Sequence, residues 1–242
     1  MTILSGPSGQ RIYISPHFDD IAFSLGALVA AHPGGTLVNV FTRSGYTVPG
    51  SSAKPEIVDR VSALRDGEDR AFAAATGLVR RALGAEEPRL RGRDPFSRRG
   101  LDDDAAQIRG ALTMLLERAC AEAAGVELFA PAGIGGHVNH LAVRRVVIDW
   151  CAGAPPGIRI YFYEDLPYAS HRSRRWRGLA GLWAATGFRR LVRREWAASP
   201  RKLDFINLYP SQLSEPVRSL AGYTPAAFWP KGPHEAVWEL VR

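Results

Sequence analysis

Cysteine and lysine are scarce in this chain of 242 residues. The two cysteines, Cys120 and Cys151, lie in apolar stretches typical of helices, and neither belongs to a CxxC pair. The sequence therefore predicts buried, reduced thiols rather than a thiolate metal site or a disulfide framework. Only three of the 31 basic residues are lysine, so arginine supplies nearly all of the positive charge.

Long apolar runs are missing as well. The longest, near Ile21–Ala31, is far shorter than the roughly 20 residues that a membrane-spanning helix needs. The opening MTILSGPSGQ has neither the basic nor the apolar region of a secretory signal. We therefore expect a soluble cytoplasmic protein without a membrane span. The 46% of apolar and 23% of charged residues exclude wholesale disorder and fibrous classes.

The charge balance is unusual, with a formal net charge of +7 and an isoelectric point of about 9.8. Such a basic chain invites a nucleic-acid interpretation. The segment His171–Lys202 carries nine arginines, one lysine and three tryptophans against a single acid, Glu195. However, the sequence contains no recognisable nucleic-acid-binding motif. The segment could instead form a solvated basic face or contact an anionic substrate or partner, and nucleic acid is not the expected partner.

Strands and helices alternate along the first two thirds of the chain, while the C-terminal third is less regular. The predicted strands are Arg11–Ser15, Thr36–Thr42, Val126–Ala130, Ile158–Tyr163 and Ala236–Val241, and the predicted helices are Ile21–Ala31, Ile57–Thr76, Leu101–Ala124 and Leu141–Trp150. A long polar loop is expected over Glu86–Gly100. This alternation favours a parallel, doubly wound sheet in a single domain over residues 1–242.

One imidazole and two carboxylates lie within four residues directly after the first predicted strand, in the stretch Ser15-Pro16-His17-Phe18-Asp19-Asp20. Ligand sites in open α/β sheets lie beyond the carboxyl ends of strands. His and Asp are both ligands for divalent metals. One aspartate could bind a metal while the other acts as a base, and the residues alone do not say which. The alternative is that one aspartate merely caps the next helix.

A second cluster, Gly133-Ile134-Gly135-Gly136-His137-Val138-Asn139-His140, also follows a predicted strand. His137 and His140 are three residues apart, so a helical turn places them on one face. Taken alone, they could be no more than polar residues at a helix N-terminus. Together with the first cluster they give two His and one Asp with an open fourth position, which is a catalytic rather than a structural zinc arrangement.

These motifs resemble those of the PIG-L/LmbE-like zinc-dependent N-deacetylases. The family combines His-Pro-Asp-Asp-Glu after the first strand with a later His-x-x-His. The matching stretches are Pro16-His17-Phe18-Asp19-Asp20, Val40-Phe41-Thr42, the Arg65/Glu68 pair, His137-x-x-His140, Tyr163-Glu164-Asp165-Leu166-Pro167-Tyr168, Lys202 and Tyr209-x-Ser211-Gln212. Phe18 stands where the family usually has proline, and Ile21 stands where it usually has glutamate. The absence of that glutamate is expected to affect either the residues that support the site or the choice of substrate.

The resemblance implies a three-layer α/β/α fold with a Rossmann-like, mostly parallel sheet. It implies that His17, Asp20 and His140 hold Zn²⁺ or another divalent metal. Asp19 would then be the general base, and His137 would stabilise the oxyanion or protonate the leaving amine. The implied reaction removes an N-acyl group, most often acetyl, from an amino sugar or a sugar-bearing metabolite, as in natural-product (antibiotic) biosynthesis.

Four further residues are candidates for substrate binding. Arg65 and Glu68 either contact sugar hydroxyls or form a surface ion pair. Glu164 and Asp165 follow a strand and share the expected catalytic edge. Asp165 either orients a ligating histidine or binds substrate, and a simple turn role is the alternative for both acids.

Two other functions remain open from the residues. One is a zinc amidohydrolase that acts on a non-sugar amide. The other is a non-catalytic basic α/β protein that binds an anion or nucleic acid. The expected partner is a small N-acyl substrate, and the arginines of Glu86–Gly100 and His171–Lys202 suggest that it is anionic.

Overall fold

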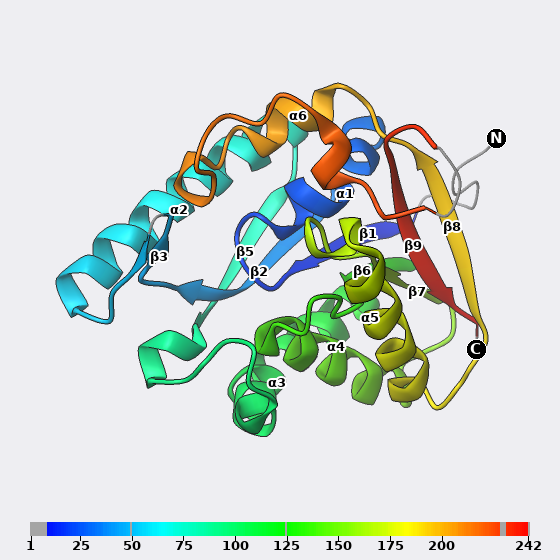
Figure 1. Ribbon diagram of the computed structural model, residues 1–242. Helices are drawn as coiled ribbons and strands as arrows, with labels where there is room; N and C mark the ends of the chain where they lie inside the picture. The colour runs from blue at the N-terminus through cyan, green and yellow to red at the C-terminus, as the bar shows by residue number, and fades with distance from the viewer. Residues whose placement is uncertain (1–8, 49, 124, 228–230, 242) are drawn as a thin grey trace.

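The computed structural model describes residues 9–48, 50–123, 125–227 and 231–241 (Figure 1). The strands are β1 (Gln10–Ser15), β2 (Thr36–Arg43), β3 (Tyr46–Thr47), β4 (Gly50–Ser51), β5 (Val79–Glu86), β6 (Val126–Pro131), β7 (Ile158–Tyr163), β8 (Leu191–Ala197) and β9 (His234–Leu240). The helices are α1 (Asp20–Ala31), α2 (Pro55–Thr76), α3 (Leu101–Glu122), α4 (Val138–Cys151), α5 (Arg172–Ala185) and α6 (Arg201–Ile206).

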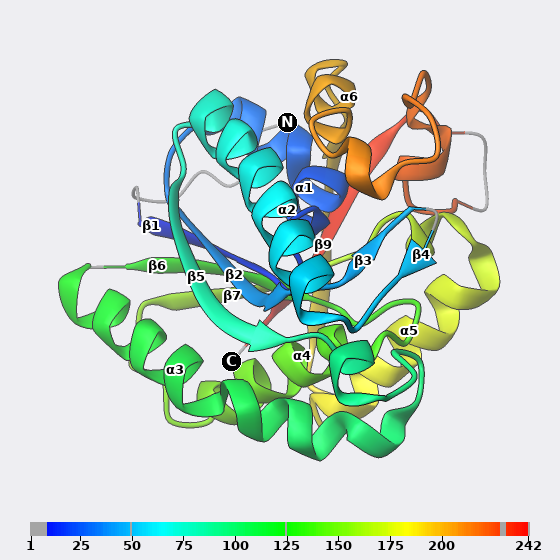
Figure 2. The ribbon, with the colours of Figure 1, turned by 90° about the vertical axis from the view of Figure 1, so that its left-hand side faces the viewer.

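The central sheet has seven strands in the order β5-β2-β1-β6-β7-β9-β8. The first five run parallel, whereas β9 pairs antiparallel with both β7 and β8. Helices cover both faces, with α1, α2 and α6 on one side and α3, α4 and α5 on the other (Figures 1 and 2). The predicted three-layer, mostly parallel α/β/α fold is confirmed.

The inner strands β1, β2, β6 and β7 were predictable because both of their faces are covered. Their burial patterns are nearly continuous, as in the fully buried run of β6. Strands that are buried on both faces carry unbroken apolar runs instead of alternating ones. The prediction for β7 matches its observed bounds, and those for β1 and β2 lie within one residue.

Four strands and two helices of the described residues were not predicted. β5 occupies one edge of the sheet and β8 the other, and both expose polar side chains. β8, α5 and the start of α6 occupy the basic segment His171–Lys202, which is therefore regular structure. A small β3–β4 hairpin forms within the loop that follows β2.

α1 contains a break that the far end of the chain stabilises. Leu25 leaves the helical conformation (φ −129°, ψ 17°), so nearby backbone N–H groups need other acceptors. The Glu235 carboxylate, on β9, accepts from the N–H groups of Ala27 at 2.8 Å and Leu28 at 3.0 Å. Lys202 Nζ lies 2.9 Å from the same carboxylate, and both side chains are fully buried.

The helices of the described ranges include none that is both long enough and apolar enough to cross a membrane.

Candidate active site

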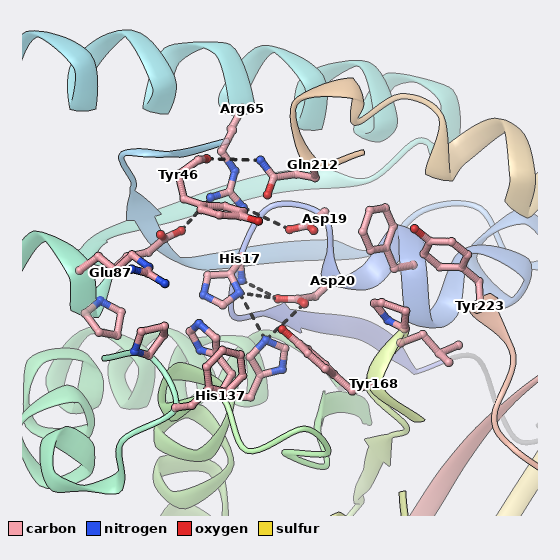
Figure 3. Close-up of a pocket in the computed structure, with 18 residues that line it drawn as sticks. His17, Asp19, Asp20, Tyr46, Arg65, Glu87, His137, Tyr168, Gln212 and Tyr223 are labelled. Carbon is pink, nitrogen blue, oxygen red and sulfur yellow. Dashed lines mark hydrogen bonds and ion pairs between the residues drawn. The ribbon is translucent and has the colours of Figure 1, made fainter. Parts of the chain in front are cut away.

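A cavity of about 320 Å³ lies beyond the carboxyl ends of the parallel strands (Figure 3). β2, β1, β6 and β7 are neighbours in the sheet, so the segments that follow them converge there. The cavity is lined by His17, Asp19, Asp20, Phe23, Tyr46, Arg65, Glu87, Pro88, Arg89, Pro95, Phe96, His137, His140, Leu166, Pro167, Tyr168, Gln212 and Tyr223. Both predicted clusters therefore meet in one cavity.

His17, Asp20 and His140 bring three metal-ligating groups together at its floor. His17 Nδ1 lies 3.3 Å from an Asp20 carboxylate oxygen and 3.3 Å from His140 Nε2. The second Asp20 oxygen lies 3.4 Å from His140 Nε2. All three residues are buried.

This donor set fits zinc. Ligand atoms about 2.0–2.1 Å from a tetrahedral zinc lie roughly 3.3–3.4 Å from one another. The nitrogens of His17 and His140 have this separation, and each of them has one of the two Asp20 oxygens at 3.3–3.4 Å. Two imidazoles and one carboxylate also leave the fourth position open, as catalytic zinc sites do.

His137 approaches the same centre. Its side chain offers a ligand nitrogen within 4.8 Å of those of His17 and His140, so the three histidines form a candidate metal cluster. His137 is also the N-cap of α4, where its Nδ1 accepts a hydrogen bond from the Asn139 N–H at 3.3 Å. Because Nδ1 accepts, the ring hydrogen of a neutral His137 belongs on Nε2. The rings of His17 and His137 pack edge to face, with their centroids 4.7 Å apart (Figure 3).

Asp19 occupies the N-cap position of α1, yet its side chain makes no capping hydrogen bond. Instead, Asp19 Oδ1 accepts from an Arg65 nitrogen at 3.2 Å. Arg65 also donates to Glu87 at 2.7 Å and to the Ser44 hydroxyl at 2.8 Å. A purely capping role for Asp19 is therefore wrong, and its carboxylate is held at the wall of the cavity, next in sequence to Asp20.

Asp165 contacts Nδ1 of His140, the ring nitrogen that does not face His17. Its Oδ1 lies 2.7 Å from His140 Nδ1, and its Oδ2 accepts from the Ile134 backbone N–H at 2.7 Å. The contact sets the His140 tautomer, with the hydrogen on Nδ1 and the lone pair of Nε2 facing the centre. Of the two roles expected for Asp165, this position favours orientation of a ligand.

Asn139 performs the same task for His17. Its Oδ1 lies 3.0 Å from His17 Nε2, and its amide nitrogen donates to the buried Asp104 at 3.0 Å. Arg91 and Arg93 in turn contact Asp104. The hydrogen of His17 therefore belongs on Nε2, which leaves Nδ1 free to bind a metal.

The remaining predicted site residues have different surroundings. Arg65 and Glu68 are both buried, so the surface ion pair considered for them is wrong. Arg65 lines the cavity, whereas Glu68 accepts from the Ser211 backbone at 2.8 Å and its hydroxyl at 2.6 Å. Glu164 is not among the lining residues of the cavity; Arg175 donates to it at 2.5 and 2.8 Å. The structure therefore does not bring Glu164 into the cavity that holds His17, Asp20 and His140.

The surroundings shift the pKa values of the ionisable groups in opposite directions. Burial lowers the pKa of His17, but the hydrogen bond and charge of Asp20 outweigh it and raise that pKa to about 9. Burial and the neighbouring Asp20 charge raise the pKa of Asp19. Burial, together with the charges of His17 and His140, lowers the pKa of His137. Asp19 thus has a strengthened affinity for a proton, and His137 is held neutral.

Aromatic rings form the walls of the cavity. Tyr46 and Phe96, 38% and 53% exposed, lie at its lining, as do Tyr168 and Tyr223. Tyr168 packs closely on the loop before α4, and any side chain at Gly135 (φ +96°) would collide with its ring. The loop can therefore follow this path only with glycine at that position.

Several site residues carried no role in the sequence interpretation. Asn139 lies inside the second predicted cluster, and its place between the two histidines is a signal that could have found it. Glu87 and Asp104 give no such signal, because an acid in a polar loop or in the first turn of a helix is usually a surface residue.

The protein thus has an α/β fold, and its cluster of His and Asp side chains lies beyond the carboxyl ends of the parallel strands. The model of the PIG-L family, described as GlcNAc-PI de-N-acetylase, matches residues 12–151. The chain belongs to the PIG-L family, as its motifs predicted.

One relative in sequence is the 2'-N-acetylparomamine deacetylase of Streptomyces fradiae. It is 38% identical over 168 residues, which are 68% of this chain but only 59% of the relative. The match thus spans less than two thirds of that enzyme.

Two solved structures share the fold over 96% of this chain. The A40926 pseudoaglycone deacetylase Dbv21 has a TM-score of 0.65 at 21% identity over 97% of its chain. A deacetylase from the teicoplanin biosynthesis pathway, solved in complex with teicoplanin, has a TM-score of 0.67 at 19% identity over 98% of its chain.

Proposed function

We propose that this protein is a zinc-dependent N-deacetylase that removes an acetyl group from an amino sugar or a sugar-bearing metabolite in antibiotic biosynthesis. The observation that carries the proposal is the grouping of His17, Asp20 and His140, in which the two imidazole nitrogens lie 3.3 Å apart and each has an Asp20 oxygen at 3.3–3.4 Å, beside the Asp19 carboxylate. Family membership and the deacetylase activities named for the relatives support it.

His17, Asp20 and His140 would hold the metal. Zinc in such a site polarises a carbonyl and lowers the pKa of water towards about 7. Asp19 is the group placed to accept the proton of the attacking water, because it adjoins a ligand and its raised pKa strengthens its basicity. Arg65 donates to the Asp19 carboxylate at 3.2 Å and so fixes its position.

His137 would act on the other side of the reacting amide. Its Nδ1 is occupied by the Asn139 N–H, so its Nε2–H is the group available to donate. A neutral donor there stabilises the negative charge that develops on the amide oxygen. Since burial and the adjacent charges lower the pKa of His137, this role suits it better than that of a pre-charged acid. Protonation of the leaving amine would use the proton taken up by Asp19.

The aromatic walls suit a sugar. Tyr46, Phe96, Tyr168 and Tyr223 offer flat apolar faces around the cavity, and pockets for small molecules combine such faces with a few polar groups. A non-sugar amide could use the same metal centre, but the named relatives favour an amino-sugar acceptor.

Metal analysis and acetate release test the proposal together. Protein purified without chelator should contain about one zinc or similar divalent ion per chain and release acetate from an N-acetyl amino sugar, free or attached to a larger scaffold. Removal of the ion with a chelator should abolish release, and added zinc should restore it. A chain that neither holds a divalent ion nor gains amidase activity with zinc contradicts the proposal.

A further inference from the structure

Two arginines, Arg65 and Arg89, line the cavity, and they differ in whether a carboxylate pairs with them. Arg65 is 2% exposed and is balanced by Asp19 and Glu87. Arg89 is exposed, and no carboxylate of the described residues lies within ion-pair distance of its guanidinium. Arg91 and Arg93, in the same loop, both reach Asp104. Of the two arginines that line the cavity, Arg89 is thus the one without a carboxylate partner among the described residues.

The backbone around Arg89 is fixed from both sides. Arg89 belongs to a short 3-10 turn, Pro88–Arg91. Before it, Glu87 is held by Arg65 at 2.7 Å, and its N–H donates to the Arg43 carbonyl at 3.0 Å. After it, Arg91 contacts the buried Asp104. The backbone of the turn is therefore held in place on both sides of Arg89. Binding of a ligand would restrict only the Arg89 side chain.

Arg89 also joins the cavity to a second hollow. A groove of about 470 Å³, here called the side groove, is lined by Ser51, Ser52, Ala53, Arg89, Gly92, Arg93 and Asp94. Arg89 is common to both linings. Asp94 is the acid of the side groove, and its Oδ1 accepts the Phe96 N–H at 3.0 Å. Arg89 therefore stands between the cavity and the side groove.

The charged groups at the floor of the cavity have partners within the protein. Asp19 and Glu87 pair with Arg65, and Asp20 lies beside His17 and His140. An anionic group on the substrate would instead meet an unpaired guanidinium at Arg89, whose planar fork suits carboxylate and phosphate oxygens.

We propose that Arg89 is a specificity residue that binds a carboxylate or phosphate on the acceptor portion of the substrate, between the cavity and the side groove. The inference rests on the proposed function, because it assigns the substrate class of the same site. Arg89 contacts the acceptor rather than the reacting amide, so its contribution belongs to binding and appears in KM rather than in kcat.

The test compares matched acceptors of different charge. The neutral probe is N-acetylglucosamine, the anionic probes are N-acetylglucosamine 1-phosphate and N-acetylmuramic acid, and the amine-bearing probe is 2'-N-acetylparomamine. Their affinities are measured by calorimetry on zinc-loaded protein carrying Asp19→Asn, so that turnover does not interfere. The wild-type chain gives kcat and KM for acetate release from the same probes.

We expect at least one anionic probe to bind about tenfold or more tightly than the neutral probe, with a preference that shrinks at high salt. Arg89→Glu should abolish this preference, and Arg89→Lys should retain part of it, because lysine keeps the charge but not the fork. The control is Arg81→Glu, which makes the same charge change on an exposed β5 residue that does not line the cavity and should keep the preference.

Several results would overturn the proposal. One is equal affinity of the wild-type protein for neutral and anionic probes, and another is an equal loss for both in Arg89→Glu. Loss of the preference in Arg81→Glu would assign it to the net charge instead. Tightest binding of the amine-bearing probe would also exclude it. If the charge preference is present but no probe releases acetate, the proposed function fails while the anion site stands. The anionic probe that binds more tightly shows whether the acceptor carries a phosphate or a carboxylate.

Discussion

His140 and Asp165 form a buried pair in which Nδ1 of the histidine lies 2.7 Å from Oδ1 of the aspartate. Both side chains are at most 2% exposed. The second Asp165 oxygen is fixed by the Ile134 N–H, in the loop that leads into α4. The aspartate two residues beyond the end of β7 therefore controls the direction of a candidate zinc ligand that belongs to α4.

Asp165→Asn should lower the affinity for zinc by about 10- to 100-fold, because the imidazole loses the carboxylate that orients it and raises its basicity. Competition with a chelator of known affinity measures the change. The matched control is Glu164→Gln, a buried neighbour whose partners are Arg175 and Arg193. An equal loss of zinc in both variants would show general destabilisation and not a specific role for Asp165.

Asp19 and Asp20 should separate turnover from metal binding. We expect Asp19→Asn to keep its zinc and lower kcat by about 10²- to 10⁴-fold, as loss of a general base does. Asp20→Asn should lose both zinc and activity. Metal content and steady-state rates on one protein preparation give both readouts.

His137→Ala completes the comparison, because His137 is the competing third ligand in the histidine cluster. Retention of zinc with reduced kcat is expected. Loss of zinc from His137→Ala and its retention in Asp20→Asn would replace our ligand set with three histidines.

Zinc affinity should rise with pH. In the zinc-free protein the pKa of His17 is raised from 6.5 to about 9, so this group stabilises the folded state fully below about 6.5 and loses that contribution as the pH passes about 9. Zinc needs the neutral imidazole and must displace this proton. Affinity should therefore increase by up to about tenfold per pH unit from 6.5 to 9 and then level off. Chelator-buffered titrations measure it, and an unchanged affinity between pH 7 and 9 would contradict it.

Lys202→Met should destabilise the fold by about 3–5 kcal/mol, because it leaves the Glu235 carboxylate buried without its counter-ion. Denaturant unfolding of the zinc-free protein measures the loss. Lys231→Met is the control, since that lysine is largely exposed and pairs with Glu195 at the surface; its effect should stay within about 0.5 kcal/mol. Similar losses for the two lysines would be the contrary result.

The inner half of the sheet could be predicted from the sequence, and its edges could not. β7 is Ile-Arg-Ile-Tyr-Phe-Tyr, a run whose composition alone indicates a buried strand. β5 is Val-Arg-Arg-Ala-Leu-Gly-Ala-Glu, and all of its residues but Ala85 are exposed or half-buried. Edge strands owe their conformation to pairing with a neighbour, and a polar segment carries no sign of that partner.

The same contrast holds for the site: short motifs could be found in the sequence, whereas contacts between residues far apart in the sequence could not. The two histidine clusters are local motifs, so they could be located from residue type and spacing. The tie between Arg65 and Glu87 joins residues 22 apart, and the contact of Asn139 with Asp104 joins residues 35 apart. Such pairs depend on the packing of whole elements, which spacing in the sequence does not reveal.

Some predictions remain predictions. They are the roles of the individual site residues, the single domain over residues 1–242 and the cytoplasmic location. The family and the fold class are confirmed.

The Glu235 carboxylate on the break in α1 has a consequence for synthesis in the cell. It joins residues 208 positions apart, from the first helix to the last strand. A ribosome must therefore produce almost the whole described chain before the buried N–H groups of Ala27 and Leu28 find their acceptor. Because the same helix begins with Asp20, this candidate metal ligand gains a finished support only late in translation. Nascent chains that stop short of β9 should therefore fail to acquire metal.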